Sequence, residues 1–233
     1  MKSFDRIILV DKPAGMSSFG VVARVRRQLT EAAGRKIKVG HAGTLDPFAT
    51  GLLILVSGKC TRRANELTKL DKVYEAVVHL GATSTTGDPE GEITENPTPP
   101  LQDPVLQKVE ETLQKFVGKI SQTPPIYSAI KIDGQRAYRL ARAGQTPKIP
   151  PRQVEIYSID LLKYDYPTLE IRAHVSSGTY IRTLAEDIGQ ELKTGAYTIA
   201  LRRIKIGQYD VRDAKQIDEL LSNRGESAKL LPV

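Results

Sequence analysis

One loop of this sequence combines the residue types that carboxylate chemistry needs. Residues 38–53 read Lys-Val-Gly-His-Ala-Gly-Thr-Leu-Asp-Pro-Phe-Ala-Thr-Gly-Leu-Leu, which places His41 and Asp46 among three glycines and a proline. Glycine adopts backbone conformations closed to other residues and proline fixes its own φ, so the pattern predicts a rigid loop of specified shape. A carboxylate on such a loop is either a turn residue, because Asp-Pro is common in turns, or a nucleophile. The loop by itself leaves both interpretations open.

The overall charge favours an anionic partner. The 233 residues contain 34 Lys and Arg against 27 Asp and Glu, a net charge of +7. Such a balance indicates nucleic acid first, although a generic basic protein has the same balance. The single cysteine, Cys60, excludes a disulfide within the chain and a thiolate zinc site. His41, His79 and His174 lack metal-ligand spacing, so no metal site is expected.

Targeting and membrane signals are also absent from the pattern. The longest strongly apolar run is Leu52–Val56, far short of the roughly 18 to 20 residues of a membrane span. Residues 1–6 lack the apolar region of a signal peptide. The expectation is therefore a soluble cytoplasmic protein.

Hydrophobic periodicity predicts a mixture of strands and helices. Strands are expected at residues 6–10, 52–56, 73–80, 154–164, 169–175 and 198–206. Helices are expected from Ser17 or Ser18 to Leu29, from Thr61 to Leu70, after the Asp103-Pro104 cap, at 135–143, from a Thr179 cap to Leu192, and at 216–221. Residues 83–100 resemble a loop. Regular β-α alternation is missing, which predicts an α+β fold with a mixed, largely antiparallel central sheet flanked by helices and loops. No domain boundary is obvious, and a single domain over 1–233 is expected.

A proline-bounded segment at about 124–152 is dense in positive charge. Its cations include Lys131, Arg136, Arg139 and Arg142, and a short helical pattern runs through it. Charge runs of this kind are usually solvated helix faces, but they also bind phosphates.

Six blocks of the sequence, in order, resemble the bacterial tRNA pseudouridine-55 synthase family of the TruB type. The similar blocks are 10–18, the Asp46 loop, 71–76 with 80–83, 122–131, 178–182 and 201–203. The resemblance implies the pseudouridine synthase fold and the isomerisation of uridine 55 in the T-loop of tRNA to pseudouridine, after base flipping and without a cofactor or metal. It makes the basic segment at 124–152 an RNA-clamping insertion.

The same resemblance assigns the catalytic residues. Asp46 matches the nucleophile, Arg182 the cation that keeps it ionised, and Tyr74 the tyrosine that packs on the flipped base and is a candidate to take a proton. From the residues alone, Arg182 is equally a solvated residue of a helix's first turn, and Tyr74 a half-buried strand tyrosine.

Three further positions match substrate-binding residues of the family. Tyr180 and Leu201 match pocket walls, and His41 matches the histidine that helps to hold the T-loop once the base has left the stack. The alternatives are a helix-start tyrosine, a strand-core leucine and a loop histidine with no role.

The implied partner is the T-arm stem-loop of tRNA, with no membrane, no obligate protein partner and a monomeric state. Full-length relatives usually continue into a further RNA-binding portion, and a complete PUA-type domain is not expected in this chain.

Three alternative functions stay open. A guide-RNA-dependent pseudouridine synthase subunit shares the catalytic core but shortens the segment from about 127 to 152. A non-catalytic RNA-binding protein or tRNA chaperone would use the same charge. A cofactor-free aspartate hydrolase would need a second acidic residue whose spacing from Asp46 indicates a catalytic pair, and the sequence does not offer one.

Overall fold

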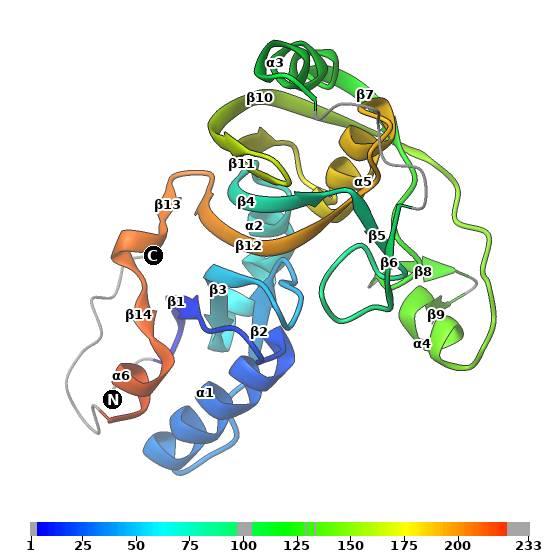
Figure 1. Cartoon of the computed structure of the whole chain (residues 1–233). Coiled ribbons are helices and arrows are strands. Elements are labelled where there is room, and N and C mark those ends of the chain that lie inside the picture. Colours follow the sequence, from blue (N-terminus) through cyan, green and yellow to red (C-terminus); the bar gives the residue numbers. More distant parts are fainter. Residues whose placement is uncertain (1–3, 97–103, 129, 133, 223–233) are drawn as a thin grey trace. The chain divides into compact units, whose positions relative to one another are not determined.

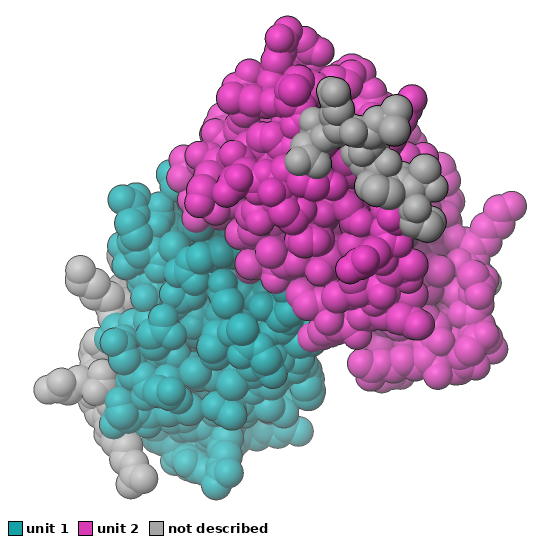
Figure 2. All heavy atoms as spheres, in the orientation of Figure 1, with its two compact units in different colours: residues 1–72, 202–233 teal, residues 73–201 magenta. Residues whose placement is uncertain are grey.

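The computed structural model describes residues 4–96, 104–128, 130–132 and 134–222 (Figure 1). Helices and strands are mixed along the chain without regular alternation, and most strand pairs are antiparallel, which confirms the predicted α+β class. The chain divides into two compact units, coloured separately in Figure 2. Unit 1 comprises residues 1–72 and 202–233, and unit 2 comprises residues 73–201. The prediction of one catalytic domain over 1–233 stays a prediction.

Unit 1 is built around a buried strand. The strand order is β14-β1-β3-β12, with β2 also paired to β3 and β13 to β12. Strand β3 reads Thr-Gly-Leu-Leu-Ile-Leu-Val-Ser and is buried over nearly its whole length, as expected of a continuous apolar run covered on both faces. The strands of this unit are β1 (Arg6–Lys12), β2 (Val39–Ala42), β3 (Thr50–Ser57), the end of β12 (Ala196–Ile206), β13 (Tyr209–Asp210) and β14 (Lys215–Gln216).

Alternate residues of β1 and β3 face two different apolar cores. One core contains Ile8, Val10, Leu53 and Leu55 with the buried stripe of α1, and the other contains Ile7, Leu9, Leu52, Ile54 and Val56 with Cys60 and Leu67. Helix α1 begins as predicted, because the Oγ of Ser17 accepts the N–H of Gly20 at 3.0 Å. The helical elements of this unit are α1 (Ser18–Ala33), the 3₁₀ helices η1 (Gly58–Arg63) and η2 (Val211–Asp213), α2 (Ala64–Thr68) and α6 (Ile217–Ser222).

Unit 2 is a twisted sheet with helices and two small hairpins. Its strand order is β12-β4-β11-β10-β7, and β10 pairs antiparallel with both of its neighbours. The strands are β4 (Lys72–Leu80), β5 (Ala82–Ser84), β6 (Ile93–Glu95), β7 (Gly118–Gln122), β8 (Lys131–Ile132), β9 (Gln135–Arg136), β10 (Arg152–Asp165) and β11 (Thr168–Val175). The helices are α3 (Leu106–Lys115), α4 (Ala137–Arg142) and α5 (Ile181–Glu191). Residues of β4 alternate between buried and half-buried, as predicted. Among the described helices, none combines the length and apolar character needed to cross a bilayer.

Helices α3 and α5 begin without the predicted caps. Helix α3 begins at Leu106 after Val105, which makes no side-chain cap, and Asp103 lies outside the described residues. Val109 and Leu113 are buried, whereas Leu106 and Val117 are exposed. Thr179 does not cap α5, because its Oγ1 donates to the carbonyl of Ser176 at 3.0 Å and Tyr180 occupies the N-cap position. At α5, a good capping residue is used by another local contact.

Several short strands were not predicted, and two helices are shorter than predicted. Strands β2 and β7 were not predicted, and the segment 83–100, expected as loop, contains β5 and β6; residues 97–100 of it lie outside the described residues. The helix expected from Thr61 begins at Ala64, because residues 58–63 form η1. The helix expected over 135–143 is confined to α4, because Gln135 and Arg136 belong to the β8–β9 hairpin.

Gly51, at the start of β3, should not tolerate a side chain. Its φ is +99°, and a Cβ there would lie 2.3 Å from the carbonyl oxygen of Arg203. Gly51→Ala should therefore lower the free energy of unfolding by more than about 3 kcal/mol, or prevent folding. Gly34→Ala is the matched control, because Gly34 has a φ of +63° but open space around it, and should cost about 1 kcal/mol. Denaturation followed by circular dichroism measures both, and equal losses would contradict the steric argument.

Candidate active site

The Asp46 loop, residues 43–49, joins β2 to β3 in unit 1. The main-chain carbonyl of Asp46 accepts the N–H of Ala49 at 3.2 Å, so Asp46 opens a turn with Pro47 in its second position. Leu45 and Ala49 are buried on either side, while Asp46 itself is half-buried. The turn interpretation is therefore confirmed for the main chain of Asp46. The role of its carboxylate as a nucleophile stays a prediction.

The segment 10–18 holds this loop from one side. The Oγ of Ser18 donates to the carbonyl of Leu45 at 2.9 Å and accepts the N–H of the same residue at 2.8 Å. The N–H of Gly15 donates to the carbonyl of Pro47 at 2.8 Å. The residues flanking Asp46 are thus each bound to the start of α1 or to the turn before it.

A buried lysine lies beneath the same turn. The side chain of Lys12 is 0% exposed, and its Nζ donates to the carbonyls of Pro13, Met16 and Pro47 at 2.8, 2.7 and 3.1 Å. Three acceptors match the three N–H groups of an ammonium. Carbonyl dipoles therefore compensate for much of the hydration that this charge loses on burial.

A buried arginine holds the other side of the loop. Arg203 is 1% exposed; its Nε donates to the carbonyl of Leu52 at 2.8 Å, and its two terminal nitrogens donate to the carbonyls of Gly43 and Thr44 at 3.1 and 3.4 Å. Burial and, secondly, the charge of Arg203 lower the pKa of Lys72 to about 8. Two buried cations, Lys12 and Arg203, therefore lie directly against the Asp46 loop.

Sequence reasoning did not assign Lys12, Ser18 or Arg203 to the site. The signal was present, because all three lie in the blocks that carry the family resemblance, 10–18 and 201–203. Their side chains act on the loop through main-chain carbonyls. Such contacts have no residue-type signature in a sequence, because every residue carries a carbonyl.

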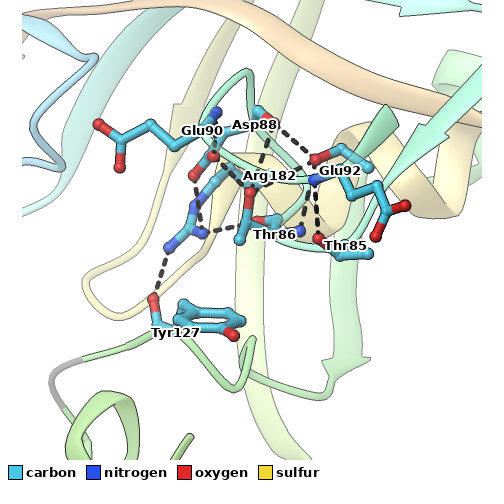
Figure 3. Close-up of polar contacts among 8 residues, drawn as sticks. Thr85, Thr86, Asp88, Glu90, Glu92, Tyr127 and Arg182 are labelled. Atoms are coloured by element: carbon cyan, nitrogen blue, oxygen red, sulfur yellow. Dashed lines mark hydrogen bonds and ion pairs between the residues drawn. The ribbon is translucent and has the colours of Figure 1, made fainter. Parts of the chain in front are cut away.

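In unit 2, Arg182 lies at the centre of a buried polar cluster (Figure 3). One terminal nitrogen donates to Oδ2 of Asp88 at 3.0 Å and to the carbonyl of Thr86 at 2.7 Å, and the other donates to the carbonyl of Tyr127 at 2.9 Å. Arg182 is 3% exposed, so its interpretation as a solvated first-turn residue of α5 is wrong.

Asp88 is the acidic partner that sequence reasoning missed. Its Oδ1 accepts the hydroxyl of Thr86 at 2.5 Å and the N–H of Glu90 at 3.0 Å, while Oδ2 accepts Arg182. The carboxylate is therefore bound from three sides and fixes one orientation of the guanidinium. Asp88 lies in a segment that reads as a polar loop and is 94 residues from Arg182 in sequence. A pattern of local spacing could not find this pair.

A second carboxyl lies near this ion pair. Glu186 follows Arg182 by one helical turn, and a Cβ added to Gly87 would lie 2.4 Å from its Oε1, so its head group packs on the Asp88 loop. Burial raises the pKa of Glu186 to about 7, and the charges of Asp187 and Asp88 add to the rise while Arg182 opposes it. Within the described residues, no three His, Cys, Asp or Glu side chains come together as metal ligands.

The remaining candidates are distributed over both units. His41 and Asp46 belong to unit 1, where His41 is half-buried on β2 and paired in register with Leu55. The four in unit 2 are Tyr74, Tyr180, Arg182 and Leu201.

Three of these residues have well-defined local surroundings. Tyr74 is buried on the inner face of β4, rather than half-buried, and Leu201 is buried on β12. Tyr180 is half-buried, with its main chain held by Gln122, which accepts its N–H at 2.8 Å and donates to its carbonyl at 3.0 Å. Gln122 is buried and lies in the family-like block 122–131.

The basic insertion presents its cations to solvent. Lys131, Arg136, Arg139 and Arg142 lie on its surface, and Lys131 lies directly opposite Arg136 in the β8–β9 hairpin. Like charges opposite one another destabilise a hairpin unless an anion binds between them. None of the four takes part in an ion pair within the described part of the chain. Residues 129 and 133 of the insertion lie outside the described residues.

Comparison with known families decides where this arrangement belongs. The family model described as "TruB family pseudouridylate synthase (N terminal domain)" matches residues 27–181, and "tRNA pseudouridylate synthase B C-terminal domain" matches residues 182–230. This chain belongs to the TruB family. The predicted resemblance is thereby confirmed, and with it the pseudouridine synthase fold.

Relatives of this TruB-family chain share sequence over most of its length. The tRNA pseudouridine synthase B of Dechloromonas aromatica (strain RCB) is 43% identical over 234 residues, 100% of this chain and 76% of that protein. That of Phocaeicola vulgatus is 43% identical over 213 residues, 91% of this chain and 90% of the relative. That of Opitutus terrae is 40% identical over 235 residues, 100% of this chain and 94% of the relative.

Solved structures are similar at a greater distance. A chain of the crystal structure of a Cbf5-Nop10-Gar1 complex has a TM-score of 0.70 and 28% identity, over 93% of this chain and 54% of that chain. A chain of an H/ACA RNP bound to a substrate RNA containing 2'-deoxyuridine has a TM-score of 0.67 and 26% identity, over 93% and 52%. The TruB-family chain thus spans about half the length of these two structural neighbours.

The stability of the chain should depend on the protonation of Glu186. The carboxyl has a pKa of about 7 in the folded chain against an ordinary value of 4.5, so the folded state binds more protons between these values. The free energy of unfolding therefore falls as pH rises through this range. Glu186→Gln keeps the shape and removes the titration. Between pH 5 and pH 8, the free energy of unfolding of this variant should rise by about 1–2 kcal/mol relative to that of the wild type, after a discount for partial exposure.

Denaturation monitored by circular dichroism at the two pH values measures this gain. Glu110→Gln, on the exposed face of α3, is the control for removing a glutamate charge. If the stability of both variants changes with pH in parallel with that of the wild type, Glu186 does not hold a proton in the folded state.

Proposed function

We propose that this chain isomerises uridine to pseudouridine in tRNA, with uridine 55 of the T-loop as the target. The observation that carries the proposal is the Asp46 loop, held by buried Lys12 and Arg203, in a chain that belongs to the TruB family. Relatives 40 to 43% identical over 91 to 100% of this chain are named tRNA pseudouridine synthase B.

The reaction breaks the bond between uracil N1 and the ribose and forms a bond from C5 to the same ribose carbon. C5 loses a proton and N1 gains one, so atoms and electrons balance without an external oxidant or reductant. A carboxylate assists such a step as a nucleophile or as a stabiliser of developing positive charge. We assign this role to Asp46. The base has to leave the stack of a folded loop before the reaction, which is the general requirement for enzymes that act on a base.

Arg182 is proposed to orient Asp46 and to keep it ionised. A guanidinium has five N–H donors in a planar fork, so it has the capacity to bind a second carboxylate while it stays paired with Asp88. The Asp88 pair and the carbonyls of Thr86 and Tyr127 hold that fork in one plane. Asp88 is accordingly a positioning residue in this proposal.

The other assigned residues contact the substrate in this proposal. Tyr74 stacks on the flipped base and is its proton acceptor, Tyr180 and Leu201 form pocket walls, and His41 supports the T-loop after flipping. The basic insertion clamps the T-arm through Lys131, Arg136, Arg139 and Arg142. We further propose that the chain acts in the cytoplasm as a monomer, without an obligate protein partner.

The alternatives are less well supported. The chains from the Cbf5-Nop10-Gar1 complex and from the H/ACA RNP are 28% and 26% identical, whereas the synthase of Dechloromonas aromatica named for tRNA is 43% identical. A non-catalytic RNA-binding protein or chaperone would have no need for an aspartate, a tyrosine and an arginine at the matching positions 46, 74 and 182. Product formation on a T-arm hairpin without guide RNA separates these functions.

Asp46→Asn should abolish pseudouridine formation while folding and RNA binding persist. The amide keeps the shape of the side chain but is neither a good nucleophile nor a negative charge. The measurement uses a T-arm hairpin RNA, with pseudouridine detected by base-specific chemistry. Appreciable turnover by Asp46→Asn, once deamidation and contamination are excluded, would remove Asp46 from its assigned role.

Arg182→Lys should lose most activity, because lysine keeps the charge but cannot form the planar, two-pronged contact. Asp88→Asn keeps Arg182 and removes its buried counter-charge, so it should lower kcat more than it raises KM. Both variants need a melting-temperature measurement, because each disturbs a buried ion pair. Near-wild-type kcat in Arg182→Lys would show that only a diffuse positive charge is required.

Neutralising Arg136, Arg139 and Arg142 together should weaken T-arm binding and flatten its salt dependence. Each lost phosphate contact lowers the log–log slope by roughly 0.7 to 0.9. The matched control replaces Arg27, Arg63 and Arg212, which are ion-paired to Glu31, Glu66 and Asp210 respectively. Identical affinities and parallel slopes for the two triple variants would mean that the insertion does not contact RNA specifically.

A further inference from the structure

One side of helix α1 faces away from the core and carries an aromatic residue with a cation. Residues Phe19, Ala23, Arg26 and Thr30, spaced by three or four, form what we call the α1 flank; the buried stripe is Val21, Val22, Val25 and Leu29. Phe19 is 65% exposed, and the guanidinium carbon of Arg26 lies 5.8 Å from the centre of its ring. A single exposed phenylalanine needs no explanation, but an aromatic ring with an arginine over it is a surface that nucleobases can stack on.

The N-terminal end of the α1 flank lies next to the Asp46 loop within unit 1. At one end, the hydroxyl of Ser18 is bonded to both main-chain polar groups of Leu45 in that loop. At the other end, the Oγ1 of Thr30 accepts the N–H of Ile37 at 3.2 Å. Strand β2 therefore runs back along α1 toward the loop, as Figure 1 shows. Phe19 lies at the end of the helix next to the proposed nucleophile.

The opposite side of α1 has a different neighbour. Gln28, on that side, donates to the carbonyl of Leu220 in α6 at 2.5 Å. Helix α6 therefore packs on the side of α1 opposite the flank. Within the flank Phe19 is exposed and Ala23, Arg26 and Thr30 are half-buried, while Arg24, Arg27 and Glu31 form a further, exposed side of α1.

The charge around the flank is positive and not neutralised locally. The turn after α1 adds three exposed cations, Arg35, Lys36 and Lys38. The ion pairs of the described residues include neither these nor Arg26, whereas the acid of α1, Glu31, is bonded to Arg27 at 2.9 Å. From Phe19 to Thr30 the helix rises about 16 Å, the span of about four to five phosphates along one strand of a duplex. Four cations and one aromatic ring match that length.

We propose that the α1 flank is a docking surface for the substrate RNA, in which a nucleobase stacks on Phe19 and Arg26, Arg35, Lys36 and Lys38 bind the adjacent phosphates. This inference rests on the proposed function, because it takes the strand next to the target nucleotide as its ligand. Positive charge along the whole surface favours RNA over a second copy of this basic chain, which would bring like charge to it.

The test compares variants of the flank in binding and turnover of a T-arm hairpin. Phe19→Ala should weaken binding by roughly tenfold, the effect of losing one base–aromatic stack, and Phe19→Tyr should restore it. Val105→Ala is the matched control, since Val105 is also 65% exposed but lies at the start of α3. Val105→Ala should keep both the wild-type affinity and the wild-type turnover, whereas Phe19→Ala should raise KM more than it lowers kcat.

Charge variants test the phosphate contacts. Arg26→Gln and Lys38→Gln should each flatten the log–log salt dependence of binding by roughly 0.7 to 0.9, while Arg27→Gln, on another side of α1, should leave the slope unchanged. Wild-type affinity in Phe19→Ala, or a salt slope in Arg26→Gln and Lys38→Gln equal to that of Arg27→Gln, overturns the proposal.

Two further outcomes separate this inference from its alternatives. If the wild type self-associates in sedimentation without RNA and Phe19→Ala abolishes the association, the flank is a protein interface and the RNA proposal fails. If the wild type binds the hairpin through Phe19 but forms no pseudouridine, the docking surface stands and the proposed function fails.

Discussion

The rest of unit 1 depends on a buried guanidinium that binds main-chain carbonyls. Arg203 donates to the carbonyls of Gly43, Thr44 and Leu52, and so ties the Asp46 loop to the strand that follows it. Gly51 allows β12 to approach closely enough for these bonds, because any Cβ there would overlap the main chain of Arg203. The loop owes its shape to this contact and to the glycines that permit it.

Buried positive charge held by carbonyls has an electrostatic consequence. Lys12 is held in the same way as Arg203, and burial together with the charge of Arg203 lowers the pKa of Lys72 to about 8. Burying a cation is expensive, so an interior with several of them favours negative charge close by. A loop that carries an aspartate, or that receives a phosphate, is what this interior suits. The stability of the buried cations and the proposed role of Asp46 therefore both favour a negative charge on this loop.

The sequence allowed the long elements to be predicted and failed for contacts that join distant segments. Strand β4 and helix α1 have strong periodicity, and both were predicted closely. The Asp46 turn was also foreseen, because Gly and Pro impose it locally. Asp88 was missed, since its importance comes from Arg182, 94 residues away. Thr179 was assigned as a cap because threonine is a good cap, yet its hydroxyl bonds to Ser176 instead. Local preference fails where the hydroxyl instead donates to a nearby carbonyl.

Net charge alone overstates how much of this chain is available to RNA. Lys12, Lys72, Arg182 and Arg203 are buried and serve the interior, so they contribute to the field but not to contacts with phosphate. Arg27, Arg63 and Arg212 are exposed but paired to acids. Exposed cations outside the ion pairs of the described residues include two groups, one at the turn and flank of α1 in unit 1 and one at the insertion in unit 2. Each unit thus has its own basic surface, and the same residue type has different roles according to burial: inside, it binds main-chain carbonyls and acids, and outside, it is available to an anionic ligand.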